Sequence, residues 1–132
     1  MEIRKIGKSG KAAGNEIAVV ESGEVFISDA GSALDFMQTV YYETGCRCIV
    51  ISKEALAEDF FVLSTRMAGE ILQKFINYRF RLAIVGDFSG YTSKPLKDFI
   101  YESNRGRDIF FVSSEEDAIE KLSSADAGGP VG

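Results

Sequence analysis

The stretch CRCIVISKEALAEDFFVLSTRMAGEILQKFINYRFRLAIVG, residues 46–86, decides the fold. It opens with a nearly continuous apolar run at 46–52 and closes with another at 81–86. Short apolar runs of this kind are typical of strands buried on both faces of a parallel sheet. Between them, apolar residues recur at helical spacing. A strand, a helix and a second strand in this order form a right-handed crossover between parallel strands, so the stretch predicts an α/β fold.

The helix inside this stretch is expected from Thr65 to about Tyr78, after a connection at 53–63 whose form the pattern leaves open. One side of the helix is apolar and the other polar, as expected for a helix that packs on a sheet. The apolar side holds Met67, Ala68, Ile71, Leu72, Phe75 and Ile76, and the polar side holds Arg66, Glu70, Gln73, Lys74 and Asn77.

The same alternation extends in both directions. Toward the N-terminus we expect a strand at 3–6, extended segments at 16–22 and 25–28, and a helix from Asp29 to Gly45. Toward the C-terminus we expect a helix capped by Ser93 and ended at 104–106, a strand at 108–112, and a helix capped by Ser113 or Ser114. The predicted order is β-β-α-β-α-β-α-β-α, a mixed, mostly parallel sheet with helices packed against it. We expect residues 1–123 to form a single domain and residues 124–132 to be a disordered tail.

Composition excludes several classes of function. The chain has 132 residues, a net charge of −5 and no histidine. Without histidine, neither a Ser-His-Asp nor a Cys-His triad can be built, and two cysteines alone cannot close a structural zinc site. An acidic chain is a poor match for nucleic acid, and the alternative is a local basic patch around Arg79, Arg81, Arg105 and Arg107. We therefore expect no nucleic-acid partner, no metal and no cofactor. The chain shows no membrane span and no secretory signal, which leads us to expect a cytoplasmic protein.

Smaller features mostly have structural interpretations. The spacing Cys46-x-Cys48 predicts two buried thiols on one strand face. The aromatic pairs at 41–42, 60–61 and 110–111 are expected mainly in the core, but one member of each pair should point away from its partner, which leaves a surface aromatic patch as the alternative. Asn104 or Gly106 is expected to supply a left-handed helix end. Alternatively, Arg105 and Arg107 receive an acidic group from a partner.

The segment GDFSGYTSK, residues 86–94, lies at the carboxyl end of a predicted strand, where open α/β sheets place their ligands. It reads either as a tight turn followed by a Ser93 cap or as an anion-binding nest. The residues of such a nest would be Gly86, Ser89, Gly90, Thr92, Ser93 and Lys94. Asp87 is a candidate acid or nucleophile, but no second catalytic group accompanies it, so we expect no enzyme.

Two resemblances add to this interpretation. The element order, with FFVLSTRMAG opening a helix, resembles the STAS or anti-sigma-factor-antagonist family, in which the first hydroxyl residue of this junction is often phosphorylated and controls partner binding. Val62 or Leu63 replaces the usual Asp, and Arg66 stands where a small residue is expected. The segments AGEILQKFINYRFRLAIVGDFSGYTSKPLKDFIYESNRG and IFFVSSEEDAIEKL are similar, over nearly the whole chain, to an uncharacterised bacterial domain-of-unknown-function family (number four-one-eight-zero), which implies no activity.

Ser64 and Thr65 therefore have two compatible interpretations. A hydroxyl at a helix start is a preferred N-cap. The STAS resemblance implies that one of the two is a phosphoacceptor, with Arg66 as a charge partner for the phosphate.

We expect a non-catalytic, cytosolic regulatory module that binds another protein, or a second copy of itself, through a rim containing Ser64, Thr65, Arg66, Asp87 and Tyr91. The alternative is a protein that binds a small molecule or anion, such as a phosphorylated metabolite or nucleotide, through the GDFSGYTSK loop.

Overall fold

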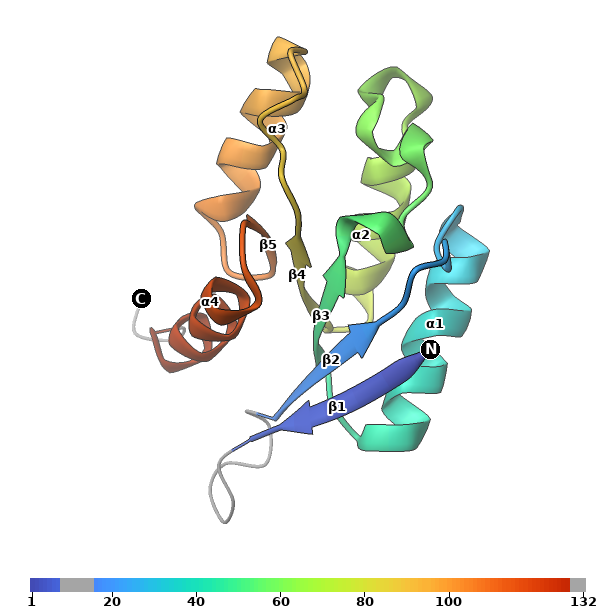
Figure 1. The fold of residues 1–132 in the computed structure, drawn as a ribbon, viewed down its shortest axis with the longest axis vertical. Helices are drawn as coiled ribbons and strands as arrows, with labels where there is room; N and C mark the ends of the chain where they lie inside the picture. The colour runs from blue at the N-terminus through green and yellow to red at the C-terminus, as the bar shows by residue number, and fades with distance from the viewer. Residues whose placement is uncertain (8–15, 129–132) are drawn as a thin grey trace.

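The computed structural model describes residues 1–7 and 16–128, shown in Figure 1. In that part of the chain the strands are β1 (Glu2–Ile6), β2 (Ile17–Glu21), β3 (Cys48–Ser52), β4 (Arg81–Val85) and β5 (Ile109–Val112). The α-helices are α1 (Ala30–Thr44), α2 (Met67–Asn77), α3 (Lys94–Asn104) and α4 (Glu115–Gly128). Three short 3-10 helices join β3 to α2: η2 (Lys53–Ala55), η3 (Glu58–Phe61) and η4 (Leu63–Thr65). The predicted α/β element order is confirmed.

The sheet runs in the order β1-β2-β3-β4-β5. β1 is antiparallel to β2, and β2 through β5 are parallel to one another. The mixed, mostly parallel sheet is therefore confirmed. The extended segment at 25–28 is not a strand, because it contributes a single isolated bridge between Ile27 and Leu56.

The helices form two layers around the sheet. Each parallel connection moves the chain one strand further in the same direction, and right-handed crossovers then place their helices on one face. Residues of α1, α2 and α3 share a core cluster with alternate residues of the strands, such as Ile49, Ile51 and Ile84. α4 packs on the opposite face through Ala118 and Leu122. Burying one such Ile or Leu stabilises the fold by about 1.5–3 kcal/mol.

The predicted helix caps hold in most places. The Asp29 carboxylate accepts the Ser32 backbone N–H at 2.7 Å, and Gly45 ends α1 with φ 74°. The Ser93 hydroxyl accepts the Leu96 N–H at 3.2 Å at the start of α3. The Ser114 hydroxyl accepts the Asp117 N–H at 3.0 Å at the start of α4.

Other local predictions are wrong. α3 does not end in a left-handed residue, because neither Asn104 nor Gly106 has a positive φ and Arg105 at the C-cap has φ −84°. α2 begins at Met67 rather than Thr65, because η4 occupies the preceding turn. Tyr41 and Tyr42 are 45% and 90% exposed rather than buried.

The two thiols are both buried, but they lie in different layers. Cys46 precedes β3 and packs with α1 and α2, whereas Cys48 lies on the α4 face. The prediction that both share one strand face is therefore wrong, since the strand begins only at Cys48.

α4 continues to Gly128, so its backbone is helical over 124–128, where we expected a disordered tail. Residues 129–132 of that tail lie outside the described residues. Within residues 1–7 and 16–128, none of the helices combines the length and apolar character needed to cross a bilayer.

Candidate functional site

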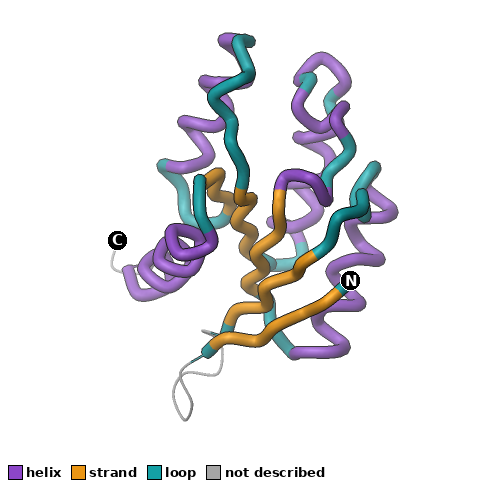
Figure 2. The backbone as a smooth tube through the Cα atoms, in the orientation of Figure 1, coloured by secondary structure: helices purple, strands orange, loops and turns teal. Residues whose placement is uncertain are grey.

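The carboxyl ends of β3 and β4 bring two irregular segments to one rim of the sheet. η2, η3 and η4 follow β3, and the loop 86–93 follows β4. Figure 2 shows both connections leaving the sheet at the same end before they enter α2 and α3. The two connections leave at the same end because β3 and β4 are parallel neighbours, and their carboxyl ends therefore lie side by side.

Thr65 holds the η3–η4 segment together and is not the N-cap of α2. Its hydroxyl oxygen lies 2.8 Å from the carbonyl oxygens of both Asp59 and Val62, which share its single proton. The same oxygen accepts the Met67 backbone N–H at 3.2 Å. Arg66 occupies the N-cap position with φ 66°, a left-handed conformation that strains a residue with a side chain. The predicted N-cap is therefore wrong by one residue, although Thr65 still satisfies one N–H of the first turn.

Ser64 differs from its neighbour. Its side chain is exposed, and within the described residues its hydroxyl makes no hydrogen bond. It lines a cavity of about 520 Å³ between the η3–η4 segment and the loop after β4. The other residues lining this cavity, named the rim cavity below, are Glu58, Phe61, Val62, Leu63, Gly90, Tyr91, Thr92, Ser93 and Pro95. Of the predicted site residues, the structure thus brings together Ser64, Gly90, Tyr91, Thr92 and Ser93.

Tyr91 is fixed at the rim cavity by two charged residues that the sequence did not identify. Lys53 Nζ donates to the Tyr91 hydroxyl at 3.0 Å, and that hydroxyl donates to Glu58 Oε2 at 3.1 Å. The Lys53 ammonium also lies 4.7 Å from the centre of the Tyr91 ring, and the Tyr91 ring stacks on Phe61 at 5.1 Å. The hydrogen bond to Tyr91 raises the pKa of Lys53, and burial opposes the shift.

Gly86 makes room for Lys53. A Cβ atom at Gly86 would lie 2.7 Å from Lys53 Cβ, closer than side-chain carbons approach one another. Lys53 directly follows the carboxyl end of β3. Because ligands of open α/β sheets bind at that end of the strands, this position in the sequence could have identified Lys53 as a rim residue.

The loop after β4 uses its own carboxylate to satisfy its polar groups. Asp87 Oδ1 accepts the Ser89 backbone N–H at 3.0 Å and the Ser89 hydroxyl at 2.6 Å. The Ser89 hydroxyl, followed by its N–H, lowers the pKa of Asp87. Lys94 pairs with Asp98 at 2.8 Å and is 82% exposed, so its ammonium is directed along α3.

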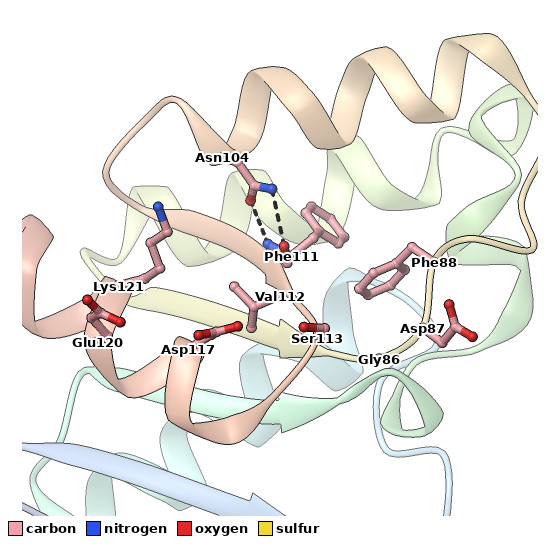
Figure 3. A pocket seen from close by; sticks show the side chains of 10 residues that line it. All are labelled: Gly86, Asp87, Phe88, Asn104, Phe111, Val112, Ser113, Asp117, Glu120 and Lys121. Carbon is pink, nitrogen blue, oxygen red and sulfur yellow. Dashed lines mark hydrogen bonds between the residues drawn. The ribbon is translucent and has the colours of Figure 1, made fainter.

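Arg66 and Asp87 belong to other surfaces than the rim cavity. Arg66 lines a groove of about 770 Å³ along the outward side of α2. Asp87 lines a cavity of about 730 Å³ between the ends of β4 and β5 and α4, drawn in Figure 3. Figure 3 shows Asp87 on the opposite side of that cavity from Asp117 and Glu120. Within residues 1–7 and 16–128, no group of three His, Cys, Asp or Glu side chains is placed to hold a metal ion.

Comparison with known proteins gives a family. Residues 12–122 match the family described as "Domain of unknown function (DUF4180)". Neither a curated protein nor a solved structure matches the chain. The match covers most of the 132 residues, and the chain therefore belongs to the DUF4180 family of unknown function.

Proposed function

We propose that the protein is a non-catalytic, cytosolic regulatory module that binds another protein through the rim around Ser64. The observation that carries the proposal is the difference between two adjacent hydroxyls. Thr65 is bonded to the backbone of its own segment, whereas Ser64 is exposed and has no partner among the described residues. A hydroxyl that the fold does not use, at the carboxyl rim of an α/β sheet, is available to a partner or to a modifying enzyme.

The surroundings of Ser64 suit a protein partner. Val62 is 47% exposed beside it, and Leu63 is half-buried. Tyr91, held by Lys53 and Glu58, offers a preorganised aromatic ring with a polar tip on the other side of the rim cavity. Exposed apolar and aromatic side chains with a polar margin are the usual composition of protein-binding surfaces.

Phosphorylation of Ser64 would act as a switch through charge. A phosphate adds roughly 1.5–2 negative charges at neutral pH. Glu58 lines the same cavity, so the modification would place two anionic groups on one side of the binding surface. Arg66 lines the adjacent groove and would have to turn toward Ser64 to pair with the phosphate, and the positive N-terminal end of α2 would add to the attraction. The STAS-like element order and the hydroxyl-bearing junction support this proposal, which includes a bacterial, cytoplasmic setting for the protein.

Anion binding by the GDFSGYTSK loop has less support. The Ser89 N–H and hydroxyl are already bonded to Asp87, and Lys94 is paired with Asp98. A thermal-shift titration with inorganic phosphate and with ATP distinguishes the two functions. A saturable rise in melting temperature that Lys94→Ala abolishes would favour the anion-binding function.

A pull-down from lysate of the source cells tests the binding function. The baits are the wild type, Ser64→Ala, Ser64→Glu and the control Gln38→Glu, which adds the same charge on the exposed face of α1. We expect one protein to be captured by the wild type, Ser64→Ala and Gln38→Glu and lost with Ser64→Glu. Capture of the same proteins by all four baits, or of none by the wild type, would contradict the proposal.

A further inference from the structure

The outer edge of β5 carries a contact that none of the preceding functions uses. The Asn104 side chain accepts the Phe111 backbone N–H at Oδ1, at 2.7 Å, and donates from Nδ2 to the Phe111 carbonyl at 3.1 Å. Figure 3 shows both bonds reaching from the end of α3 to β5. One carboxamide thus binds the N–H and the C=O of a single strand residue, as a residue of a neighbouring strand would do.

β5 has only two residues whose backbone faces this edge. The Leu82 N–H bonds to the Asp108 carbonyl, and the Gly86 N–H bonds to the Val112 carbonyl, so even-numbered residues of β5 face β4. Because backbone groups alternate along a strand, Ile109 and Phe111 face outward. β5 pairs with β4 on its other side and is the last strand of the sheet.

A second copy of this chain would fit the open edge in one symmetric register. If two β5 strands met antiparallel about Phe110, Ile109 of each would lie opposite Phe111 of the other. Residues opposite one another in such a pair exchange both backbone hydrogen bonds. The two pairs would form about four bonds, and each of them would use the N–H or the C=O of a Phe111. The Asn104 carboxamide is already bonded to the N–H and the C=O of Phe111. One side chain in each copy therefore prevents all of the hydrogen bonds between the two strands.

The sequence of β5 makes such protection necessary. Ile109–Val112 is IFFV, an apolar strand without charge and rich in residues that favour β-structure. Exposed edges of this kind pair with other chains unless they are covered or carry charges. We propose that Asn104 closes the β5 edge against a second copy of this chain, by replacing the hydrogen bonds that the second copy's β5 would make.

The test compares Asn104→Ala with two control variants by sedimentation velocity over a wide concentration range. Asn77→Ala is the matched control, since Asn77 is also the last residue of an eleven-residue helix and is exposed. Asn104→Asp keeps an acceptor for the Phe111 N–H and places a charge at the edge. We expect Asn104→Ala to form a species of twice the wild-type mass as concentration rises, and the two controls to keep the wild-type mass. If Asn104→Ala fails to fold, Asn104→Ser replaces it, and we expect it to form the same species of twice the wild-type mass.

Amide hydrogen exchange identifies the edge itself. In the wild type, the Phe111 amide should exchange at least tenfold more slowly than the outward-facing Ile109 amide. In Asn104→Ala, the Ile109 amide should become protected as the doubled species forms. An Asn104→Ala or Asn104→Ser protein that keeps the wild-type mass at every concentration would overturn the proposal. A species of twice the wild-type mass whose Ile109 amide stays unprotected would also overturn it. So would a wild-type Phe111 amide that exchanges as fast as the Ile109 amide.

Discussion

Replacing Thr65 by valine removes the hydroxyl while keeping the branched shape of the side chain. The carbonyls of Asp59 and Val62 each keep a backbone partner, because they also accept the N–H groups of Val62 and Thr65. The net loss there is about one hydrogen bond, or about 1 kcal/mol. The Met67 N–H also loses its acceptor at the start of α2, and a lost cap of this kind costs about 1 kcal/mol. The site is exposed, so water can replace part of the donated hydrogen bond and part of the bond accepted from the Met67 N–H. We therefore expect Thr65→Val to lower the unfolding free energy by about 1–2 kcal/mol.

Urea denaturation measures this difference. With a denaturant slope of roughly 2 kcal/mol per molar, the midpoint should fall by about 0.5–1 M at an unchanged slope. Ser64→Ala is the matched control, and its midpoint should stay within about 0.25 M of the wild type because the Ser64 hydroxyl has no partner among the described residues. Thr65→Ser should restore most of the loss. Equal midpoints for Thr65→Val and Ser64→Ala would refute the division of roles between the two hydroxyls.

Three further outcomes follow from the structure. Arg66→Gly should raise the unfolding free energy by about 0.5–1 kcal/mol in the same assay, because glycine adopts the φ of 66° without strain; a destabilised variant would show that the Arg66 side chain contributes more than its backbone costs. Gly86→Ala should lower the unfolding free energy by about 1–3 kcal/mol, because the added methyl group meets Lys53 Cβ at 2.7 Å; a variant as stable as the wild type would contradict that packing. The pKa of Asp87 lies below its ordinary 3.8, mainly through the Ser89 hydroxyl, so its contribution is present above that pH and is lost as pH falls through the lower, folded value. NMR titration of the Asp87 carboxyl carbon should give a midpoint below 3.8 in the wild type and a higher one in Ser89→Ala.

The parts of the fold that sequence predicts well are those governed by local patterns. The apolar runs at 46–52 and 81–86 became β3 and β4 because strands covered on both faces admit few polar residues. The caps at Asp29 and Ser93 follow from the need of helix starts for a hydroxyl or carboxylate acceptor. The parallel direction of β2 to β5 follows from the alternation of strands and helices, but the order of the strands in the sheet was not predicted.

The start of α2 could not be predicted in the same way. A hydroxyl pair before an apolar stripe resembles a cap, but the Thr65 hydroxyl bonds backward to Asp59 and Val62 and so stabilises a 3-10 turn in place of the first helical turn. That choice depends on how η3 folds back on η4, which helical periodicity does not encode.

The polar contacts of the rim, and the Asn104 contact on β5, depend on how different elements meet. Lys53, Glu58 and Tyr91 meet across 33 and 38 positions of the chain. The Asn104 contact with Phe111 arose where the sequence predicted only a left-handed helix end. Neither pairing has a local signature, because each is set by the way the helices and the connections after the strands pack around the sheet.

The most direct test of the proposed switch is quantitative phosphopeptide mapping of the protein isolated from its source cells, across several growth conditions. Cleavage after Lys53 and after Arg66 gives a peptide, residues 54–66, that contains both hydroxyls. Its fragment ions distinguish a phosphate on Ser64 from one on Thr65. We predict phosphate on Ser64 in at least one condition and an unmodified Thr65, because of these two hydroxyls the one on Ser64 has no hydrogen-bond partner in the part of the chain that the structure describes. Phosphate on Thr65, or an unmodified Ser64 in every condition, would contradict the switch.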